Sequence, residues 1–589
     1  MSLSLVFAGV FLAASMPWCI VSGQEARAIG QKQPPVSSRG RLPVTGCAGQ
    51  PISDIIVITQ PPFTDRLPAR LEWARRTVRR THANTRDEVV RRFLLMKVGE
   101  PCNQIRRAES ERILRAQPFL VDARIRAFDD EAGGVRLEVE TRDDVSIIFA
   151  PMIQFKSPLV RGMRIGDSNL GGSATLAAIN WRDGQSYNDP LGVNFENYAF
   201  GRGRNEFRLA AQRYRFGQDM RIEFVRPYYT DLQRYAWIAS LGGTREPMQF
   251  RRGDLPRNAL TTRREFANVG AVARVGPVGR LRLVGASITR EVQSTDEQSL
   301  LLTRDGVRED TTKVAVPTFR PQRVVRANAL LGVRAIRFVQ VQGFDALTGA
   351  QDVRVGMQLG LVAGRSIAVR QARDRDAFMA ANLYAAYGGA RSFVGLQAIS
   401  EARYDRDARA WDNFVMSGRL AWYFRPAIRQ TTVVESEWSA GRDMRVPFQV
   451  SLADREGGLM GHRLSNQAGA QRLIFRAEQR LVVPTRLNVA DIGFAGFAEA
   501  GRLWAEQSVP YSISTPWRGA VGLSVLAAVP PRSRRLWRVD FALPISVDPQ
   551  RRFEVRFTSV DRSRVFWNEP REVQAGRERT APSSLFTWP

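Results

Sequence analysis

Most of the chain alternates apolar and polar residues with a period of two. From about residue 145 onward, segments of roughly 8 to 12 residues show this alternation, and Gly, Pro, Asp and Asn separate them. In residues 536–544 the apolar face carries Trp537, Val539, Phe541 and Leu543, and the other face carries Arg538, Asp540 and Ala542. Strands with one apolar and one polar face are typical of a transmembrane β-barrel, which meets lipid outside and water inside.

A soluble β-sandwich alternates in the same way and is the alternative fold. Aromatic residues near segment ends favour the barrel, because they match the girdles at lipid interfaces. They are Trp181, Tyr198, Tyr228, Tyr229, Trp422, Tyr423, Trp504, Trp537 and Trp567. After residue 23 no run approaches the roughly 18 apolar residues of a membrane helix, which excludes a helical membrane protein. In lipid every backbone amide needs a partner, so we predict a closed antiparallel barrel of about 16 strands over residues 143–568.

The composition excludes most metalloenzymes and gives no sign of catalysis. The 589 residues include 2 His and 3 Cys, too few for multi-His or Cys-rich metal sites. No Gly-x-Ser-x-Gly, Walker, His-Glu-x-x-His or Cys-x-x-Cys motif occurs, so we expect no enzyme and no cofactor. The net charge of +28 would suit nucleic acid, but arginines facing a lumen or lipopolysaccharide phosphates explain it equally well, and we expect no nucleic-acid partner.

The N-terminus resembles a secretory signal peptide over residues 1–23, with an apolar stretch followed by Val21-Ser22-Gly23. A buried N-terminal segment is the alternative. Cleavage there leaves an arm over residues 24–51 and two cysteines, Cys47 and Cys102, which an oxidising periplasm would permit to form a disulfide. Residues 44–47 also resemble a lipoprotein processing box, although no apolar core precedes them.

Residues 52–142 predict a small module with the order β-α-α-β-β. Residues 52–59 read as a strand, and Thr85 with Glu88 forms a capping box for a helix that Gly99 can end. Asn103 caps a second helix, on which Ile105, Ile113 and Leu114 can face a core. Residues 119–128 and 135–141 then alternate about a turn, as in a hairpin.

This module resembles a POTRA domain, the periplasmic polypeptide-transport-associated domain. The resemblance rests on the segments TRDEVVRRFLLMKVGEPC, AESERILRAQPFLVDARI and GGVRLEVETRDD. An unrelated small α/β domain is the alternative. A POTRA module followed by a long barrel resembles the outer-membrane assembly and secretion superfamily of BamA, TamA and two-partner-secretion transporters.

Two barrel motifs strengthen the resemblance. Residues 166–172, with the sequence GDSNLGG, look like the family's Asn-Leu-x-Gly strand end. Leu459, Met460, Gly461 and His462 stand where the family has its Val/Leu-Arg-Gly-Tyr/Phe loop motif, which implies a loop held inside the lumen. In the family the motif arginine reaches inward-facing acidic residues, matched here by Glu478 and Glu499.

Met460 replaces that arginine and His462 replaces the aromatic residue, so the chain departs from the motif. Two unpaired carboxylates in a confined lumen would repel each other. We therefore predict that a nearby arginine substitutes, Arg463 first and then Arg472 or Arg476. Hydration of both glutamates by luminal water is the alternative.

The resemblance implies an outer-membrane location with the POTRA domain in the periplasm. It implies a factor that assembles, inserts or translocates unfolded outer-membrane or secreted polypeptides, with outer-membrane lipid, lipopolysaccharide and a possible periplasmic protein as further partners. The barrel would open between its first and last strands, while exposed edges of the module accept a strand. A passive pore or surface receptor, and a two-partner-secretion transporter, are the alternatives. A polar tail over residues 569–589 follows the last predicted strand, and it either extends into the periplasm or folds back.

Overall fold

The computed structural model describes residues 44–62, 76, 82–130, 132–153, 160–182, 191–201, 203–214, 216–252, 257–303, 306–310, 317, 319–368, 374–453, 457–462, 467–484, 489–545, 553–561 and 566–580. The predicted signal peptide, most of the N-terminal arm, Arg463 and the last nine residues of the tail lie outside these ranges. None of the described helices is both long enough and apolar enough to cross a bilayer.

The N-terminal module is a five-stranded sheet covered by two helices. Its strand order is β1-β4-β5-β2-β3, in which β2 and β5 are parallel and the other pairs are antiparallel. The elements are β1 (Val44–Thr45), β2 (Ala48–Gln60), α3 (Asp87–Phe93), β3 (Pro101–Asn103), α4 (Gln104–Arg115), β4 (Leu120–Asp129) and β5 (Val135–Asp143). The predicted β-α-α-β-β order is present, with the short strands β1 and β3 added.

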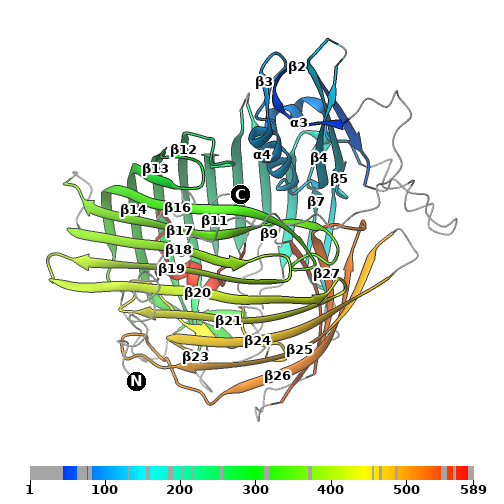
Figure 1. Ribbon diagram of the computed structural model, residues 1–589. Coiled ribbons are helices and arrows are strands. Elements are labelled where there is room, and N and C mark those ends of the chain that lie inside the picture. The colour runs from blue at the N-terminus through cyan, green and yellow to red at the C-terminus, as the bar shows by residue number, and fades with distance from the viewer. Residues whose placement is uncertain are drawn as a thin grey trace. The chain divides into compact units, whose positions relative to one another are not determined.

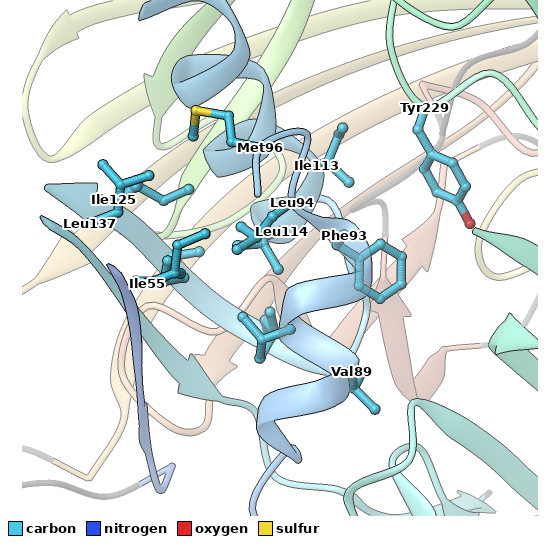
Figure 2. Packing of buried hydrophobic residues seen from close by; sticks show 14 of the residues in the cluster. Ile55, Val89, Phe93, Leu94, Met96, Ile113, Leu114, Ile125, Leu137 and Tyr229 are labelled. Atoms are coloured by element: carbon cyan, nitrogen blue, oxygen red, sulfur yellow. The ribbon is translucent and has the colours of Figure 1, made fainter. Parts of the chain in front are cut away.

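The module's core lies between its helices and its sheet (Figure 2). Alternation in β4 and β5 buries every second residue, and most of the apolar residues of both helices are buried against them. The core residues include Ile55, Val89, Phe93, Ile113, Leu114, Ile125 and Leu137, each at most 4% exposed. Tyr229, from the loop between two barrel strands, completes this core with its ring centroid 6.0 Å from that of Phe93.

The first helix differs from the prediction at both ends. Its N-cap is Arg86, without a side-chain cap, because the Thr85 hydroxyl is hydrogen-bonded to Asp143 instead. It ends at Phe93, well before Gly99, which occupies a turn with φ +86°.

The second helix begins as predicted. The Asn103 side chain accepts hydrogen bonds from the backbone N–H groups of Ile105 and Arg106, which confirms the cap. Ile113 and Leu114 are buried as predicted, but Ile105, in the first turn of the helix, is 57% exposed and does not face the core.

A disulfide joins Cys47 and Cys102. It links the chain just before β2 to β3, the edge strand that precedes the second helix. The end of the N-terminal arm is thereby attached to the module.

The remaining strands form a closed antiparallel barrel (Figure 1). The described residues contribute 20 strands to the ring, so the predicted number of about 16 is too low. In chain order they are β6 (Ile147–Ile153), β7 (Val160–Asp167), β8 (Thr175–Arg182), β9 (Leu191–Phe200), β10 (Asn205–Tyr214), β11 (Gly217–Arg226), β12 (Tyr235–Phe250), β13 (Arg257–Val275), β14 (Leu281–Thr303), β16 (Gln322–Gln342), β17 (Ala350–Ser366), β18 (Asp376–Gly388), β19 (Ser392–Asp405), β20 (Ala410–Ala427), β21 (Gln430–Arg442), β24 (Gln471–Val483), β25 (Asp491–Trp504), β26 (Arg518–Ala528), β27 (Arg535–Pro544) and β28 (Glu554–Asp561).

Charge-rich segments account for the difference in strand number. A short strand, β15 (Gly306–Glu309), also extends the hairpin beside β14. Charged residues that obscure the alternation in sequence pair across neighbouring strands, as Arg208 of β10 does with Glu196 of β9 at 2.8 Å. Such pairs let polar segments remain regular strands.

The two faces of the barrel differ as the alternation predicts. In β27, Phe541 and Leu543 are exposed, whereas Asp540 and Ala542 are buried inside. The predicted aromatic girdle is only partly present. Trp181 and Trp422 are exposed, but Tyr198, Tyr228, Tyr229, Tyr423 and Trp567 are buried, because they pack against the module or inside the barrel.

The ring closes between its two ends in sequence, β28 and β6. These strands have 8 and 7 residues, whereas β14 and β16 have 23 and 21. We call the junction of β28 and β6 the seam.

Candidate functional site

The loop between β21 and β24 folds into the barrel. Two-residue strands β22 (Val450–Ser451) and β23 (Ala468–Gly469) pair within it, and Ala453 forms a bridge with Leu459. Leu459 is fully buried, together with Phe448 and Leu452 of the loop and Ile474 and Leu503 of the barrel wall. We call the described parts of residues 443–470 the luminal loop.

Two of the predicted motif residues, Met460 and Gly461, contact the wall through their backbone, and His462 contacts it through its ring. The Met460 N–H donates a hydrogen bond to the Glu499 carboxylate on β25. The Gly461 N–H donates to Oε2 of Glu554 on β28 at 3.1 Å, and His462 lies with Nε2 3.2 Å from the Gly519 carbonyl oxygen. The loop therefore contacts both a central wall strand and the seam strand β28.

Gly461 has a specific steric role in this arrangement. Its φ of +77° is in the left-handed region, and a Cβ there would lie 2.9 Å from Cδ of Pro544. A side chain at this position would be strained and crowded.

An arginine of the wall takes the place that the resemblance gives to a loop arginine. Arg476 of β24 lies with Nε 3.1 Å from Oε2 of Glu499, its direct cross-strand neighbour. Its Nη2 also donates to the Gly458 carbonyl oxygen at 2.8 Å. Arg476 thus connects the luminal loop to a wall carboxylate. In the motif of the family that the chain resembles the arginine lies on the loop, whereas here it lies on the barrel wall.

The other predicted arginines lie elsewhere. Arg472 donates to the Ser451 carbonyl oxygen at 2.7 Å and lies 3.5 Å from Glu572. Arg463 falls outside the described residues. Of the arginines we predicted, Arg476 is the one that the structure places beside Glu499.

Glu478 belongs to a separate group of charges on the wall. It pairs with Arg480 of its own strand and with Arg538 of β27, whose Nη1 lies 2.9 Å from Oε2 of Glu478. Arg538 pairs in turn with Asp540 at 2.9 Å. The two predicted lumen partners are therefore divided: Glu499 contacts the luminal loop, and Glu478 joins wall strands.

Sequence reasoning missed the C-terminal segment as part of this site. The helix α5 (Arg571–Gly576) packs on the luminal loop, with Val573 fully buried among Phe448 and Leu459. Glu572 accepts a hydrogen bond from the Ser451 N–H at 3.1 Å and pairs with Arg251 at 3.1 Å. The only signal in the sequence was a short charged segment after the last alternating strand.

A buried polar group joins the module to the barrel at the predicted Asn-Leu-x-Gly strand end. Asp143, the last residue of β5, accepts a hydrogen bond from the Thr85 hydroxyl at 2.8 Å and lies 3.0 Å from Nε2 of His82. Asn169 of the motif donates to the Thr85 hydroxyl oxygen at 2.8 Å. The motif therefore holds the start of α3 against the barrel.

The second helix of the module provides another attachment. Arg112 donates to the Tyr229 carbonyl oxygen, and its guanidinium carbon lies 3.9 Å from the ring centroid of Phe338 on β16. Glu109 pairs with Arg112 at 3.0 Å. Burial raises the pKa of Glu109, but the Arg112 guanidinium and hydrogen bonds from Arg112 and Thr230 more than offset this, so the pKa lies below its ordinary value.

No group of three or more residues that could hold a metal ion occurs in the part of the chain that the structure describes. The site is thus a set of loop–wall and module–barrel contacts built from arginines, carboxylates and backbone amides. Such contacts can hold or release a polypeptide segment.

No family model matches the chain, and no curated protein sequence matches it significantly. Among solved structures, the chain is similar to BamA from Haemophilus ducreyi lacking POTRA domains 1–3, at 10% identity, with 86% of this chain and 84% of that chain covered and a TM-score of 0.38. It is similar to CdiB from Acinetobacter baumannii, at 10% identity, 87% and 74% coverage and a TM-score of 0.39. CdiB from Escherichia coli gives 10% identity, 90% and 93% coverage and a TM-score of 0.37. Likenesses this weak assign no function to the chain.

Proposed function

We propose that the chain is an outer-membrane protein of the BamA/TamA-like superfamily that assists assembly, insertion or translocation of outer-membrane or secreted polypeptides. In this proposal residues 1–23 direct export, residues 52–142 are a single periplasmic POTRA domain, and residues 143–568 are the barrel. Apolar side chains exposed around the whole ring support placement in lipid. Examples from five strands, each at least 43% exposed, are Ile179, Val269, Leu331, Leu420 and Leu523.

The observation that carries the proposal is the short seam. A lateral opening breaks the backbone hydrogen bonds of one strand pair, and its free-energy cost grows with the length of that pair. The β28 and β6 strands have 8 and 7 residues, so the seam holds far fewer bonds than the β16–β17 pair of 21 and 17 residues. A client strand can replace the lost bonds by pairing with the opened edges.

The module offers a second strand edge. Strand β2 pairs with β5 along Ile52–Gln60 on one side. On the other side β3 and the residues before it bond its backbone as far as Ile52, whose N–H donates to the Glu100 carbonyl oxygen at 3.0 Å. The Ile55 carbonyl oxygen accepts from Arg91 at 2.7 Å, so we propose that the edge beyond Ile55 accepts an extended peptide by β-augmentation.

The luminal loop has a supporting role in this proposal. Its contact with Glu499 fixes the loop to β25, and its contact with Glu554 fixes the loop to β28, which forms one side of the seam. We propose that residues Leu459–His462, with Arg476 in place of the family's arginine, hold β28 in its closed position. A passive pore is less well supported, because the luminal loop and α5 lie inside the barrel.

Site-specific photo-crosslinking tests client binding. A photo-reactive residue in place of Ile58, which is 40% exposed on β2, should crosslink unfolded outer-membrane polypeptides in the periplasm. The matched control replaces Ile105, which is 57% exposed on α4 and away from the strand edge. Equal crosslinking at both positions, or none at Ile58, would contradict binding at the β2 edge.

Depletion of the protein tests the function as a whole. The abundance of other outer-membrane or secreted proteins should fall when the chain is depleted and recover on re-expression. An unchanged outer-membrane proteome would favour the pore or receptor alternative.

A further inference from the structure

The C-terminal segment crosses the lumen after leaving the seam strand. Strand β28 ends at Asp561, and the described chain resumes at Phe566. Figure 1 shows α5 in red behind the strands of the barrel wall, and it contacts β20 and β21. We call residues 566–580 the luminal tail.

Arg577 is the first anchor of the luminal tail. Its Nη2 donates to the Ser417 hydroxyl at 2.8 Å and to the Ile399 carbonyl oxygen at 2.9 Å. Its Nε donates to Glu569 of the tail itself at 2.8 Å. This guanidinium is therefore shared between the wall strands β19 and β20 and the tail.

Glu578 is the second anchor. Its carboxylate accepts hydrogen bonds from Arg326 of β16, at 3.0 Å for one of them, and from Gln322 at 3.1 Å. Asp376 of β18 binds the opposite side of the same guanidinium, with Nε at 2.9 Å. The side chains of Arg326, Asp376 and Glu578 are at most 3% exposed, so the wall arginine is held between a wall carboxylate and a tail carboxylate.

Two further wall carboxylates bind the backbone of the tail. Glu401 accepts from the Glu578 N–H at 2.8 Å, and Glu291 accepts from the Arg579 N–H at 3.2 Å and the Thr580 hydroxyl at 2.9 Å. Glu401 and Glu291 are 2% and 1% exposed. Buried carboxylates are costly without hydrogen-bond donors, and here the tail supplies donors to both.

We propose that this part of the wall is a peptide-binding site, formed by Glu291, Arg326, Glu401 and Ser417, and that the luminal tail is its resident occupant and closes the lumen. In this site the Ser417 hydroxyl accepts from a cation, and Arg326 binds a carboxylate. Glu401 and Glu291 accept hydrogen bonds from two consecutive backbone amides. Its ligand class is an extended peptide segment with adjacent basic and acidic residues, as Arg577-Glu578 provides.

The sharpest test is the ion conductance of the full-length protein in planar bilayers. Arg577→Ala should raise the open fraction at least about tenfold, because it removes the buried pair between the tail guanidinium and the wall carboxylate Glu401, whose atoms lie 3.5 Å apart. Arg571→Ala, which removes an exposed guanidinium from the same segment, should leave the open fraction unchanged. A synthetic peptide of residues 566–580 should reduce the conductance of the Arg577→Ala protein, whereas a scrambled peptide should not. Equal conductance of the two variants, both with a folded heat-modifiable barrel, would overturn the proposal.

An engineered crosslink provides a second test, in which a covalent bond replaces the anchor that Arg577→Ala removes. A Cβ at Gly457 would lie 3.4 Å from Cβ of Pro570, close to the usual separation in a disulfide. Gly457 has a φ of +82°, so a cysteine there is strained, and we expect Gly457→Cys with Pro570→Cys to form the disulfide in only a fraction of the folded protein, which is purified for the measurement. Added to Arg577→Ala, the crosslink should keep the lumen closed when oxidised and let it open when reduced.

The control for the reductant is Arg577→Ala alone, which also contains the native Cys47–Cys102 disulfide. A crosslinked protein that conducts like Arg577→Ala would overturn the proposal. These readouts concern ion passage, so they are distinguishable from the client-binding tests of the proposed function.

Discussion

Individual arginines hold the interior of this barrel together. Arg326, Arg334, Arg403 and Arg419 are at most 1% exposed, and each has a carboxylate within salt-bridge distance. Arg476 is less buried, with a side chain that is 22% exposed, but it also joins a carboxylate, Glu499, to the luminal loop. Removing one member of such a pair leaves an uncompensated charge in a confined lumen.

Arg476→Met should lower the free energy of unfolding by less than the about 3–5 kcal/mol of a fully buried pair, because the Arg476 side chain is 22% exposed. Urea denaturation in detergent micelles measures this change. Arg502→Met on β25, where the cation lies 5.3 Å from the Trp504 ring, is the matched control and should cost less than about 1 kcal/mol. Glu499→Gln on the Arg476→Met background should recover part of the loss, and an additive further loss would contradict the pairing.

Glu109 makes the attachment of the module to the barrel dependent on pH. Its pKa is lower in the folded protein than the ordinary value of 4.5, so its contribution to stability is complete above that value and disappears as the pH falls through the lowered pKa. The protection factors of the α4 amides, which correct for the pH dependence of intrinsic exchange, should therefore fall on acidification below about pH 4.5. Glu109→Gln should weaken docking by about 1–3 kcal/mol at neutral pH and remove most of this acid dependence. Identical acid profiles for both proteins would be inconsistent with the assignment.

At the scale of single residues, the sequence identified the charged residues that face the lumen but not the residues with which they pair. Glu478, Glu499 and Arg476 could all be recognised as inward-facing residues of alternating strands. Which of them meet depends on the register between β24 and β25, and one residue of register shift moves every side chain to the other face. The division between Glu499 and Glu478 therefore could not be predicted from the sequence.

The described strands differ in length around the ring, and the shortest ones, β28, β6, β7 and β8, with 7 or 8 residues each, are neighbours. Short neighbours share few hydrogen bonds, so local opening should occur first in this group of strands, which contains the seam. Backbone amides of β6 and β28 should exchange with solvent deuterium at least about tenfold faster than those of β16 and β17. Mass spectrometry in lipid nanodiscs measures these rates, and uniform protection around the ring would show that the seam is not a weak point.

The alternation correctly predicted strands and the existence of two faces. It did not always show which face points inward. Leu281 and Leu283 of β14 are 2% and 1% exposed and pack inside against Tyr228 and Leu330, whereas Arg282 lies on the outer face. Near the module the barrel interior is apolar, so the usual assignment of apolar residues to lipid fails there.

At the scale of the whole molecule, the module and the barrel share one apolar core. Tyr229 and Tyr198 of the barrel lie in the same cluster as Phe93 and Phe119 of the module. Neither part therefore buries its apolar surface completely without the other. The sequence predicted two domains, but it could not predict that barrel loops complete the core of the first.

Tyr229→Ala should destabilise the module by about 3 kcal/mol, because it leaves a cavity beside Phe93. Tyr229→Phe keeps the ring and loses only the hydrogen bond to Glu206, so its effect should be about 1 kcal/mol. Tyr235→Ala, at a residue that is 63% exposed, is the matched control. Protease resistance of the module in the full-length protein measures the effect, and equal resistance for the Ala and Phe variants would contradict a shared core.

The short connection between β28 and the luminal tail has a thermodynamic consequence. Asp561 and Phe566 are five residues apart, so their Cα atoms can be separated by at most about 18 Å. If β28 leaves the ring, it must either keep within this tether or pull Phe566 from its place beside Arg419. Seam separation and tail release are then coupled equilibria, and coupling of this kind is reciprocal. A ligand that binds only after the luminal tail is released would therefore favour opening of the seam. A client bound at the opened seam would favour release of the luminal tail by the same factor.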